Sequence, residues 1–375
     1  MPRKLVLLAA ALLASTPALA APTDCPLRDA PFSVDSPLVD VLLSPAASAV
    51  LDRFQSGMTT RLPPEKRSTK APTFLAILSP RVGLSLSGVR DPARVAEIDA
   101  ALRALPVTPA DRIARCERYD NERPRLTIPK GKLKLLLFEK MTGFRDGPSV
   151  EAAKAMFQDL ARRNGWALVI TDKAGVMNPA QLARFDAVIW NNVSGDVLTL
   201  SQRRAFEQYI AGGGGYVGVH GAAGDFIYFW DWYADTLIGA RFADHTGKPH
   251  FQDARVAIEA NPAGIGASLA PGWTMQDEWY SFRASPRLTG ATVVATLDET
   301  SYNPVGNGGQ SIAMGDHPIA WTRCLGDGRS FYSAIGHLPE SYSDPRHLRL
   351  LEDAIRWAAG KGTTRCRAGR QVAPR

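Results

Sequence analysis

Between residues 132 and 220, short apolar runs alternate with amphipathic stretches of helical periodicity. The apolar runs have the length of strands that are buried on both faces, as in parallel sheets. In chain order the pattern predicts a strand at 135–139, a helix at 149–164, a strand at 166–171, a short helix at 178–185, a strand at 187–190, a helix at 199–211 and a strand at 216–219. Three strand–helix units followed by a fourth strand predict an α/β fold with a doubly wound, mostly parallel sheet.

The chain before this region has a different pattern. Four short helices are predicted at 38–43, 46–54, 93–105 and 110–119, each after a capping residue followed by proline. The apolar run at 74–78 is the best strand candidate there, and the polar, proline-containing stretch at 59–73 is predicted to be a loop. Residues 21–130 are therefore interpreted as a small helical module that packs against the main domain.

The remaining chain has a mixed pattern. Strands are predicted at 255–258, 292–297, 319–324 and 330–335, and a closing helix at 345–359. The predicted organisation is a leader at 1–20, a helical module at 21–130, an α/β domain at 131–360 and a tail at 361–375.

The first twenty residues have the pattern of a secretory signal peptide. Arg3 and Lys4 precede an apolar run at 5–13, and Ala18-Leu19-Ala20 forms a small-residue cleavage site. No later segment has transmembrane length. We therefore expect a periplasmic or secreted protein that starts near Ala21 and has no membrane span.

The charge pattern argues against a nucleic-acid partner. The formal net charge is +7, and loss of Arg3 and Lys4 with the leader leaves +5. The basic residues are interspersed with acids, and no basic–aromatic stripe occurs, so the charge fits a solvated surface.

Four cysteines in an exported chain predict two disulfides, for which three pairings are possible. We favour Cys25–Cys116, within the N-terminal module, and Cys324–Cys366, which would tie the tail to the main domain. No C-x-x-C motif supports a zinc ribbon or a thioredoxin-like site.

Polar residues follow several of the predicted strands. Arg145 lies after the first strand, Asn192 after the third, His220 after the fourth and His337 after the strand at 330–335. Because ligands of open α/β sheets bind at the carboxyl ends of the strands, this pattern predicts a ligand site there. A core histidine bonded to a carbonyl, and amide caps at strand ends, remain the structural alternatives.

Two further groups carry candidate chemistry. Asp277 and Glu278 precede Trp279 and Tyr280, a composition suited to acid/base work beside a sugar-stacking face. In an extended segment adjacent side chains point to opposite faces, so one carboxylate is expected to enter the site.

His245 and His250 bracket a predicted loop. They lack the helical H-E-x-x-H frame of a zinc site, so we expect no metal and no other cofactor, with a divalent metal as the less favoured alternative.

Six motifs in order resemble the ThuA-like (trehalose-utilisation) domain family. These are the segments 212–223, 237–245, 277–280, 297–302, 316–321 and 328–337, within a resemblance that covers about residues 132–360. The resemblance implies a flavodoxin-like fold akin to class I glutamine amidotransferases. It also implies a role in carbohydrate metabolism, with disaccharides or keto-sugars as substrates.

The chain departs from the resembled proteins at two positions. His220 stands where amidotransferases have a nucleophilic cysteine, so the chain is not expected to be a glutaminase. Asp146 stands where the family often has a histidine, which puts any metal or acid/base role at that position in doubt.

Together these features predict a sugar-acting enzyme, an isomerase, lyase or hydrolase, with His220 as general acid/base. Asp277 or Glu278 would orient His220 or act as the partner base. The expected substrate-binding residues are Arg145, Asn192, His245, Tyr280, His317 and His337. Two alternatives stay open: a non-catalytic carbohydrate-binding or scaffold protein, and a metal-dependent hydrolase using His220 and His245. The sequence leaves the oligomeric state open.

Overall fold

The computed structural model describes residues 23–57, 67–361 and 366. The predicted leader at 1–20 lies outside the described residues, as do parts of the predicted loop at 59–73 and of the tail.

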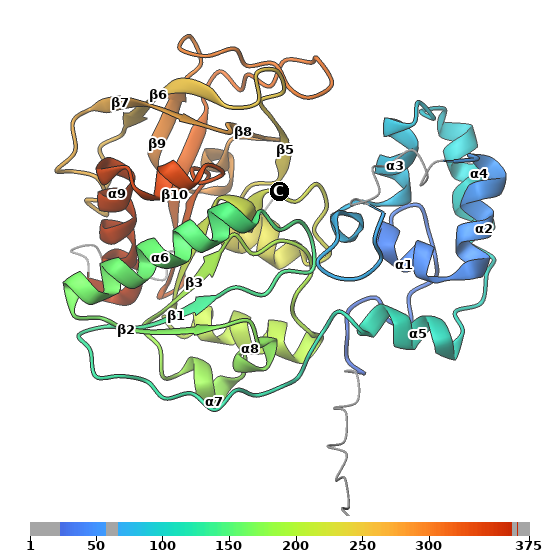
Figure 1. The fold of residues 1–375 in the computed structure, drawn as a ribbon, viewed down its shortest axis with the longest axis horizontal. Coiled ribbons are helices and arrows are strands. Elements are labelled where there is room, and N and C mark those ends of the chain that lie inside the picture. The colour runs from blue at the N-terminus through green and yellow to red at the C-terminus, as the bar shows by residue number, and fades with distance from the viewer. Residues whose placement is uncertain (1–22, 58–66, 362–365, 367–375) are drawn as a thin grey trace, which may run out of the picture.

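Within the described residues, nine strands form one sheet in the order β2-β1-β3-β4-β11-β10-β9-β6-β7 (Figure 1). The first five strands of that order are mutually parallel, and the other four continue antiparallel. The bounds are β1 Lys134–Phe138, β2 Ala167–Thr171, β3 Ala187–Asn191, β4 Gly215–Val219, β6 Gln252–Ile258, β7 Gly272–Asp277, β9 Thr292–Asp298, β10 Pro318–Leu325 and β11 Gly328–Ser333. The predicted α/β fold with a doubly wound, mostly parallel sheet is confirmed.

Helices cover both faces of this sheet. Helices α6 and α9 lie on one face, and α7 and α8 on the other (Figure 1). Their bounds are α6 Gly147–Asn164, α7 Pro179–Leu182, α8 Leu200–Ala211 and α9 Pro345–Arg356, and short helical turns lie at η3 Ala174–Val176, η4 His220–Ala223, η5 Trp232–Ile238, η6 Pro286–Thr289, η7 Pro339–Tyr342 and η8 Trp357–Lys361. Within the sheet, β2 lies outward of β1 in one direction, and β4 lies outward of β3 in the opposite direction. The strand order therefore reverses between β1 and β3, which is the place where such sheets bind ligands.

A second, two-stranded sheet was not predicted. It pairs β5 (Phe242–His245) with β8 (Tyr280–Phe282) and sets His245 opposite Tyr280. Its strands are only four and three residues long, too short for a periodicity signal.

The N-terminal module is helical, as predicted, and has its own apolar core. Its elements are α1 Leu38–Leu43, α2 Pro45–Phe54, η2 Phe74–Ile77, α3 Pro80–Leu86, α4 Pro92–Arg103 and α5 Pro109–Cys116. The strand predicted at 74–78 is wrong. The segment is a 3-10 turn whose start is capped by the Thr73 side chain, which accepts a hydrogen bond from the Leu75 amide.

Both favoured disulfides are present. Cys25 is bonded to Cys116, and Cys324 at the end of β10 is bonded to Cys366. In the part of the chain that the structure describes, no helix is long and apolar enough to cross a membrane.

Candidate active site

The turn after β4 places His220 at the carboxyl edge of the parallel strands. His220 has a backbone φ of 39°, in the left-handed region that residues with a Cβ rarely adopt. Its Nδ1 lies 2.8 Å from the Ala334 carbonyl, and its own carbonyl accepts a hydrogen bond from the Tyr332 hydroxyl. Such constrained backbone is typical of functional sites.

Asn192, at the end of β3, supports the same turn. Its φ is 52°, and its Oδ1 accepts a hydrogen bond from the Gly221 amide at 3.1 Å. Its Nδ2 donates to Asn191 and to the Tyr342 hydroxyl. The side-chain atoms of Asn192 are therefore used to position the turn that carries His220.

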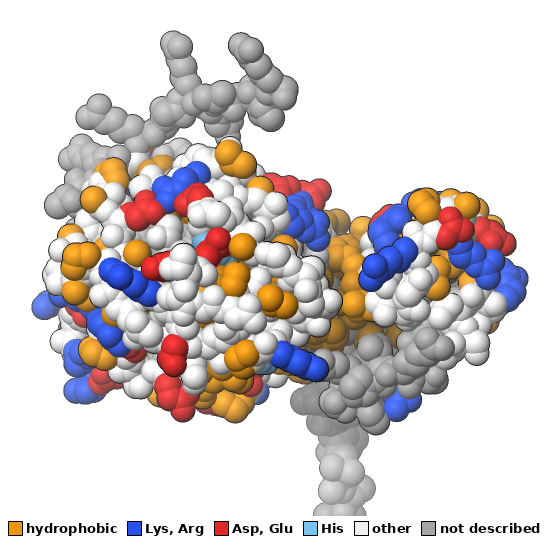
Figure 2. Space-filling model, turned by 90° about the horizontal axis from the view of Figure 1, so that it is seen from above, with side chains coloured by type: hydrophobic (Ala, Val, Ile, Leu, Met, Phe, Trp, Pro, Cys, Tyr) orange, Lys and Arg blue, Asp and Glu red, His pale blue; other side chains and the backbone are white. Residues whose placement is uncertain are grey.

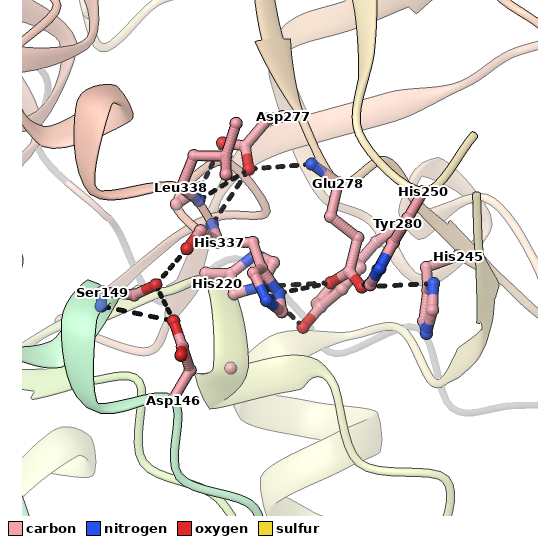
Figure 3. Close-up of polar contacts among 12 residues, drawn as sticks. Asp146, Ser149, His220, His245, His250, Asp277, Glu278, Tyr280, His337 and Leu338 are labelled. Atoms are coloured by element: carbon pink, nitrogen blue, oxygen red, sulfur yellow. Dashed lines mark hydrogen bonds and ion pairs between the residues drawn. The ribbon is translucent and has the colours of Figure 1, made fainter. Parts of the chain in front are cut away.

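Four of the chain's six histidines meet a single buried carboxylate (Figure 3). On one oxygen of Glu278, Oε2, His337 Nδ1 lies at 2.9 Å and His220 Nε2 at 3.3 Å. On the other oxygen, Oε1, His245 Nδ1 lies at 3.2 Å and His250 Nε2 makes a short contact. Glu278 follows the last residue of β7, so a strand end from the antiparallel part of the sheet meets those from the parallel part. We call these five residues the Glu278 cluster.

Electrostatics favour the ionised form of Glu278. Burial alone would raise the pKa of this carboxyl, but hydrogen bonds from His220, His250 and His337 lower the pKa well below its usual range. For His337, burial opposes the charge, and the hydrogen bond to Glu278 raises its pKa above the usual value for histidine. The cluster therefore holds a charged carboxylate in a buried position.

Asp277 points away from the cluster and into the backbone. Its oxygens accept hydrogen bonds from the amides of Gly336, His337 and Leu338 and from the Ser341 hydroxyl. The carboxylate thus fixes the loop after β11 that delivers His337 (Figure 3). Of the two adjacent acids, the structure places Glu278 in the site and Asp277 beneath it.

A cavity of about 430 Å³ opens onto the Glu278 cluster. Its polar lining includes Asp146, Asn192 and Asn307 in addition to the cluster. Its apolar lining includes Phe74 and Ile77 from the N-terminal module, with Phe144, Phe226 and Phe242. Figure 2 shows the module as a smaller lobe beside the main body, with hydrophobic side chains gathered where the two meet. The module therefore forms part of the site.

Three residues expected to bind substrate do not line this cavity. Arg145 pairs with exposed Glu151, and His317 is buried between Glu299 and the Tyr280 carbonyl. Trp279, expected to offer a stacking face, is buried and donates its indole N–H to the Gln252 carbonyl. Asn192, His245, His337 and Tyr280 do lie at the cavity, and the Tyr280 hydroxyl is 2.9 Å from His220 Nε2.

Sequence reasoning missed Asp225 in the cavity wall. Its carboxylate accepts hydrogen bonds from the Ser194 hydroxyl at 2.6 Å and the Gly195 amide at 2.7 Å. Burial nevertheless raises its pKa to about 7. It follows η4, outside any strand, so no strand-end pattern pointed to it.

Two overlapping groups in the cluster have ligand atoms close enough together for a metal ion. One group is His220, Glu278 and His337, and the other is His245, His250 and Glu278. Imidazole and carboxylate are donors that suit zinc and neighbouring transition metals.

The fold and the site define a flavodoxin-like α/β protein with a histidine–glutamate cluster at the carboxyl edge of its parallel strands. The family described as trehalose utilisation, ThuA, matches residues 134–358, so the chain belongs to the ThuA family.

The chain is also similar to solved structures. The chain is similar to a putative ThuA-like protein from Bacteroides uniformis, with 26% identity and a TM-score of 0.52, over 64% of this chain and 97% of that one. It is also similar to a putative ThuA-like protein from Parabacteroides merdae, with 17% identity and a TM-score of 0.46, over 62% and 92% of the two chains. No curated protein matches the chain.

Proposed function

We propose that this protein is an exported enzyme that acts on a disaccharide or keto-sugar by acid/base chemistry at the Glu278 cluster. The observation that carries the proposal is the convergence of four histidines on one buried carboxylate at a cavity. Imidazole and carboxylate side chains exchange protons near neutral pH, as reactions at a sugar hydroxyl or beside a carbonyl require.

We assign the roles of the site residues from where each side chain lies in the cluster and the cavity. The acid/base centre is at His220 and Glu278, where His220 Nε2 meets the carboxylate and the Tyr280 hydroxyl. His337 and His245 bind substrate oxygens around it, and Asn192 and Asp277 act as positioning residues. The cavity has the size of a small-molecule site. ThuA membership supports a carbohydrate as the substrate class.

Two features support export. The first twenty residues have a signal-peptide pattern, and both cysteine pairs are disulfide-bonded, as is typical of oxidising compartments. Expression of the full-length gene in a Gram-negative host tests this part. We expect the mature N-terminus near Ala21 in the periplasmic fraction, and an uncleaved chain in the cytoplasm would contradict it.

The experiment that tests the function is proton NMR of the mature protein with trehalose, related disaccharides and their 3-keto derivatives. We expect new sugar resonances with wild type and none with Glu278→Gln, which keeps the side chain's shape but removes the charge. Glu340→Gln is the matched control, because Glu340 is an exposed glutamate on the neighbouring turn η7 and should leave conversion unchanged.

Line broadening without new resonances would mean that the protein binds sugars without converting them. Full conversion by Glu278→Gln would exclude the Glu278 cluster as the reacting centre.

A further inference from the structure

Three potential ligand atoms in the Glu278 cluster form a small triangle. His337 Nδ1 and Glu278 Oε2 are 2.9 Å apart, His220 Nε2 and His337 Nδ1 are 3.2 Å apart, and His220 Nε2 and Glu278 Oε2 are 3.3 Å apart. All three side chains are buried or nearly so, with 17% exposure or less. They come from three separate parts of the chain, so local sequence proximity does not explain their convergence.

The distances between these three atoms match those between neighbouring ligand atoms around one metal ion. Nitrogen and oxygen ligands lie about 2.0–2.2 Å from a zinc ion, which places neighbouring ligand atoms about 3.4 Å apart in a tetrahedral site. An octahedral site brings them to about 3.0 Å. Two of the three distances, 3.2 and 3.3 Å, lie within this interval and the third, 2.9 Å, lies just below it, so one ion can contact all three atoms with little movement of the side chains.

The tautomer of His220 is also suited to a cation. Its Nδ1 donates to the Ala334 carbonyl, so in the neutral ring Nε2 carries a lone pair. That lone pair can accept a hydrogen bond from the Tyr280 hydroxyl at 2.9 Å, and it lies 3.3 Å from Glu278 Oε2, so that one cation can contact both the nitrogen and the oxygen. A carbonyl bonded to the outer nitrogen is also the usual support of a metal-bound histidine.

The Glu278 carboxylate is also held in place by residues outside the proposed ligand set. Its second oxygen, Oε1, contacts His245 and His250, which leaves Oε2 directed to His220 and His337. The alternative group around Oε1 is less suited to an ion. His245 Nδ1 lies 2.9 Å from the Thr246 carbonyl, so it carries a proton and has no lone pair for a metal.

We propose that His220, Glu278 and His337 bind a divalent first-row transition cation of the Zn²⁺ type, with its open coordination positions toward the cavity. Two imidazoles and one carboxylate disfavour Mg²⁺ and Ca²⁺, which prefer all-oxygen sites. Three protein ligands with an open position are the pattern of catalytic rather than structural zinc.

This inference rests on the proposed function and deepens it. His220, Glu278 and His337 would hold the cation through their free electron pairs, and a bound cation would supply the acid/base chemistry by lowering the pKa of water at this position. A cation with open positions also favours substrates that present a carbonyl or adjacent hydroxyl oxygens, as keto-sugars do.

The test is metal analysis of the mature protein, purified without chelators or metal-affinity resin and dialysed against Zn²⁺. We expect about one zinc per chain by mass spectrometry. Titration of the apoprotein with Co²⁺ should give the visible absorption bands of a nitrogen- and oxygen-ligated ion. Glu278→Gln and His337→Gln should weaken Co²⁺ binding by about 100-fold or more, since even outer-shell changes cost 10- to 100-fold. Glu340→Gln should bind as wild type does.

The Co²⁺ spectrum of wild type keeps the test independent of whether the variants fold. Absence of zinc and of Co²⁺ bands would overturn the proposal and assign the cluster to a proton network through Tyr280. Wild-type Co²⁺ affinity in Glu278→Gln would overturn it too. Conversion of sugar by metal-free protein would refute the cation's part in the reaction and keep the proposed function. Stoichiometric metal without conversion of any sugar would keep the cation site and contradict the proposed function.

Discussion

At the scale of single residues, the site depends on carboxyl groups whose environments differ. Glu278 receives histidine contacts on both oxygens, and Asp277 receives backbone amides. Asp225 has only a hydroxyl and one amide to offset its burial. The pKa of Glu278 is therefore lowered, while that of Asp225 is raised to about 7. Each carboxyl's charge is set by its donors rather than by burial alone.

Asp225 should make stability depend on pH. In the unfolded chain its carboxyl loses the proton near pH 4, whereas the folded protein holds it up to about pH 7. Over that window the folded state binds more protons, so the free energy of unfolding falls as pH rises, by about 4 kcal/mol in total. Asp225→Asn, which can keep both hydrogen bonds if the Ser194 hydroxyl turns, should lack this loss. Urea unfolding of both proteins at pH 4.5 and 7.5 checks it, and parallel pH profiles would contradict it.

The site residues that directly follow predicted strands could be predicted from the sequence. Strand ends are visible as apolar runs that stop at a polar residue, so His220, Asn192 and His337 could be placed at one edge. Alternation predicted that one of Asp277 and Glu278 would enter the site, but not which one. The convergence of His245 and His250 on Glu278 could not be predicted, because it depends on how the antiparallel strands and their loops fold back.

At the scale of elements, the turn η2 joins the N-terminal module to the site. Phe74 in this turn makes edge-to-face contacts with Phe144 and Phe226, each at 6.3 Å between ring centroids. These three rings form an apolar part of the wall of the cavity that opens onto the Glu278 cluster. A sugar ring or other apolar part of the ligand that extends away from the reacting centre would meet this wall.

Phe74→Ala should therefore weaken binding of a disaccharide more than binding of its monosaccharide unit. Loss of one aromatic face is expected to cost about 0.5–1.5 kcal/mol, or about two- to twelvefold in Kd. Isothermal titration with both sugars measures the ratio. Leu86→Ala is the control, since Leu86 lies in the same module but is 72% exposed and away from the cavity. Equal losses for both sugars would show that the wall does not contact the second ring.

Elements were predictable where their signals are local. A capping residue before proline marked the starts of α1, α2, α4 and α5 to within one residue. The side chains of Asp91 and Thr108 do cap α4 and α5, whereas α1 and α2 begin at the same signal without a side-chain cap. The same signal at Ser79-Pro80 opens α3, which was not among the predicted helices. The run at 74–78 forms a 3-10 turn although its pattern predicts a strand, because a buried 3-10 turn and a short buried strand are equally apolar.

At the scale of the whole molecule, the two large hydrophobic cores of the described residues lie side by side, and a small third cluster surrounds the Cys25–Cys116 disulfide. One fills the module and the other fills the α/β domain, and Phe226 packs against both. Each part has its own disulfide: Cys25–Cys116 spans 91 residues of the module, and Cys324–Cys366 spans 42 residues of the domain. Separate cores and separate crosslinks imply that each part can lose stability without the other.

Removing each disulfide should accordingly act on a different part of the protein. Loop-entropy arguments give a cost of about 4–5 kcal/mol for the Cys25→Ser/Cys116→Ser pair and about 4 kcal/mol for the Cys324→Ser/Cys366→Ser pair. All eight tryptophans lie between residues 166 and 357, so tryptophan fluorescence reports the domain alone, whereas far-ultraviolet circular dichroism reports both parts. In urea, the first pair should give an early circular-dichroism transition without a fluorescence change. The second pair should move the fluorescence transition itself to lower urea. Coincident transitions for the first pair would mean that the module and the domain unfold as one unit, bound together through the wall that they share at the cavity.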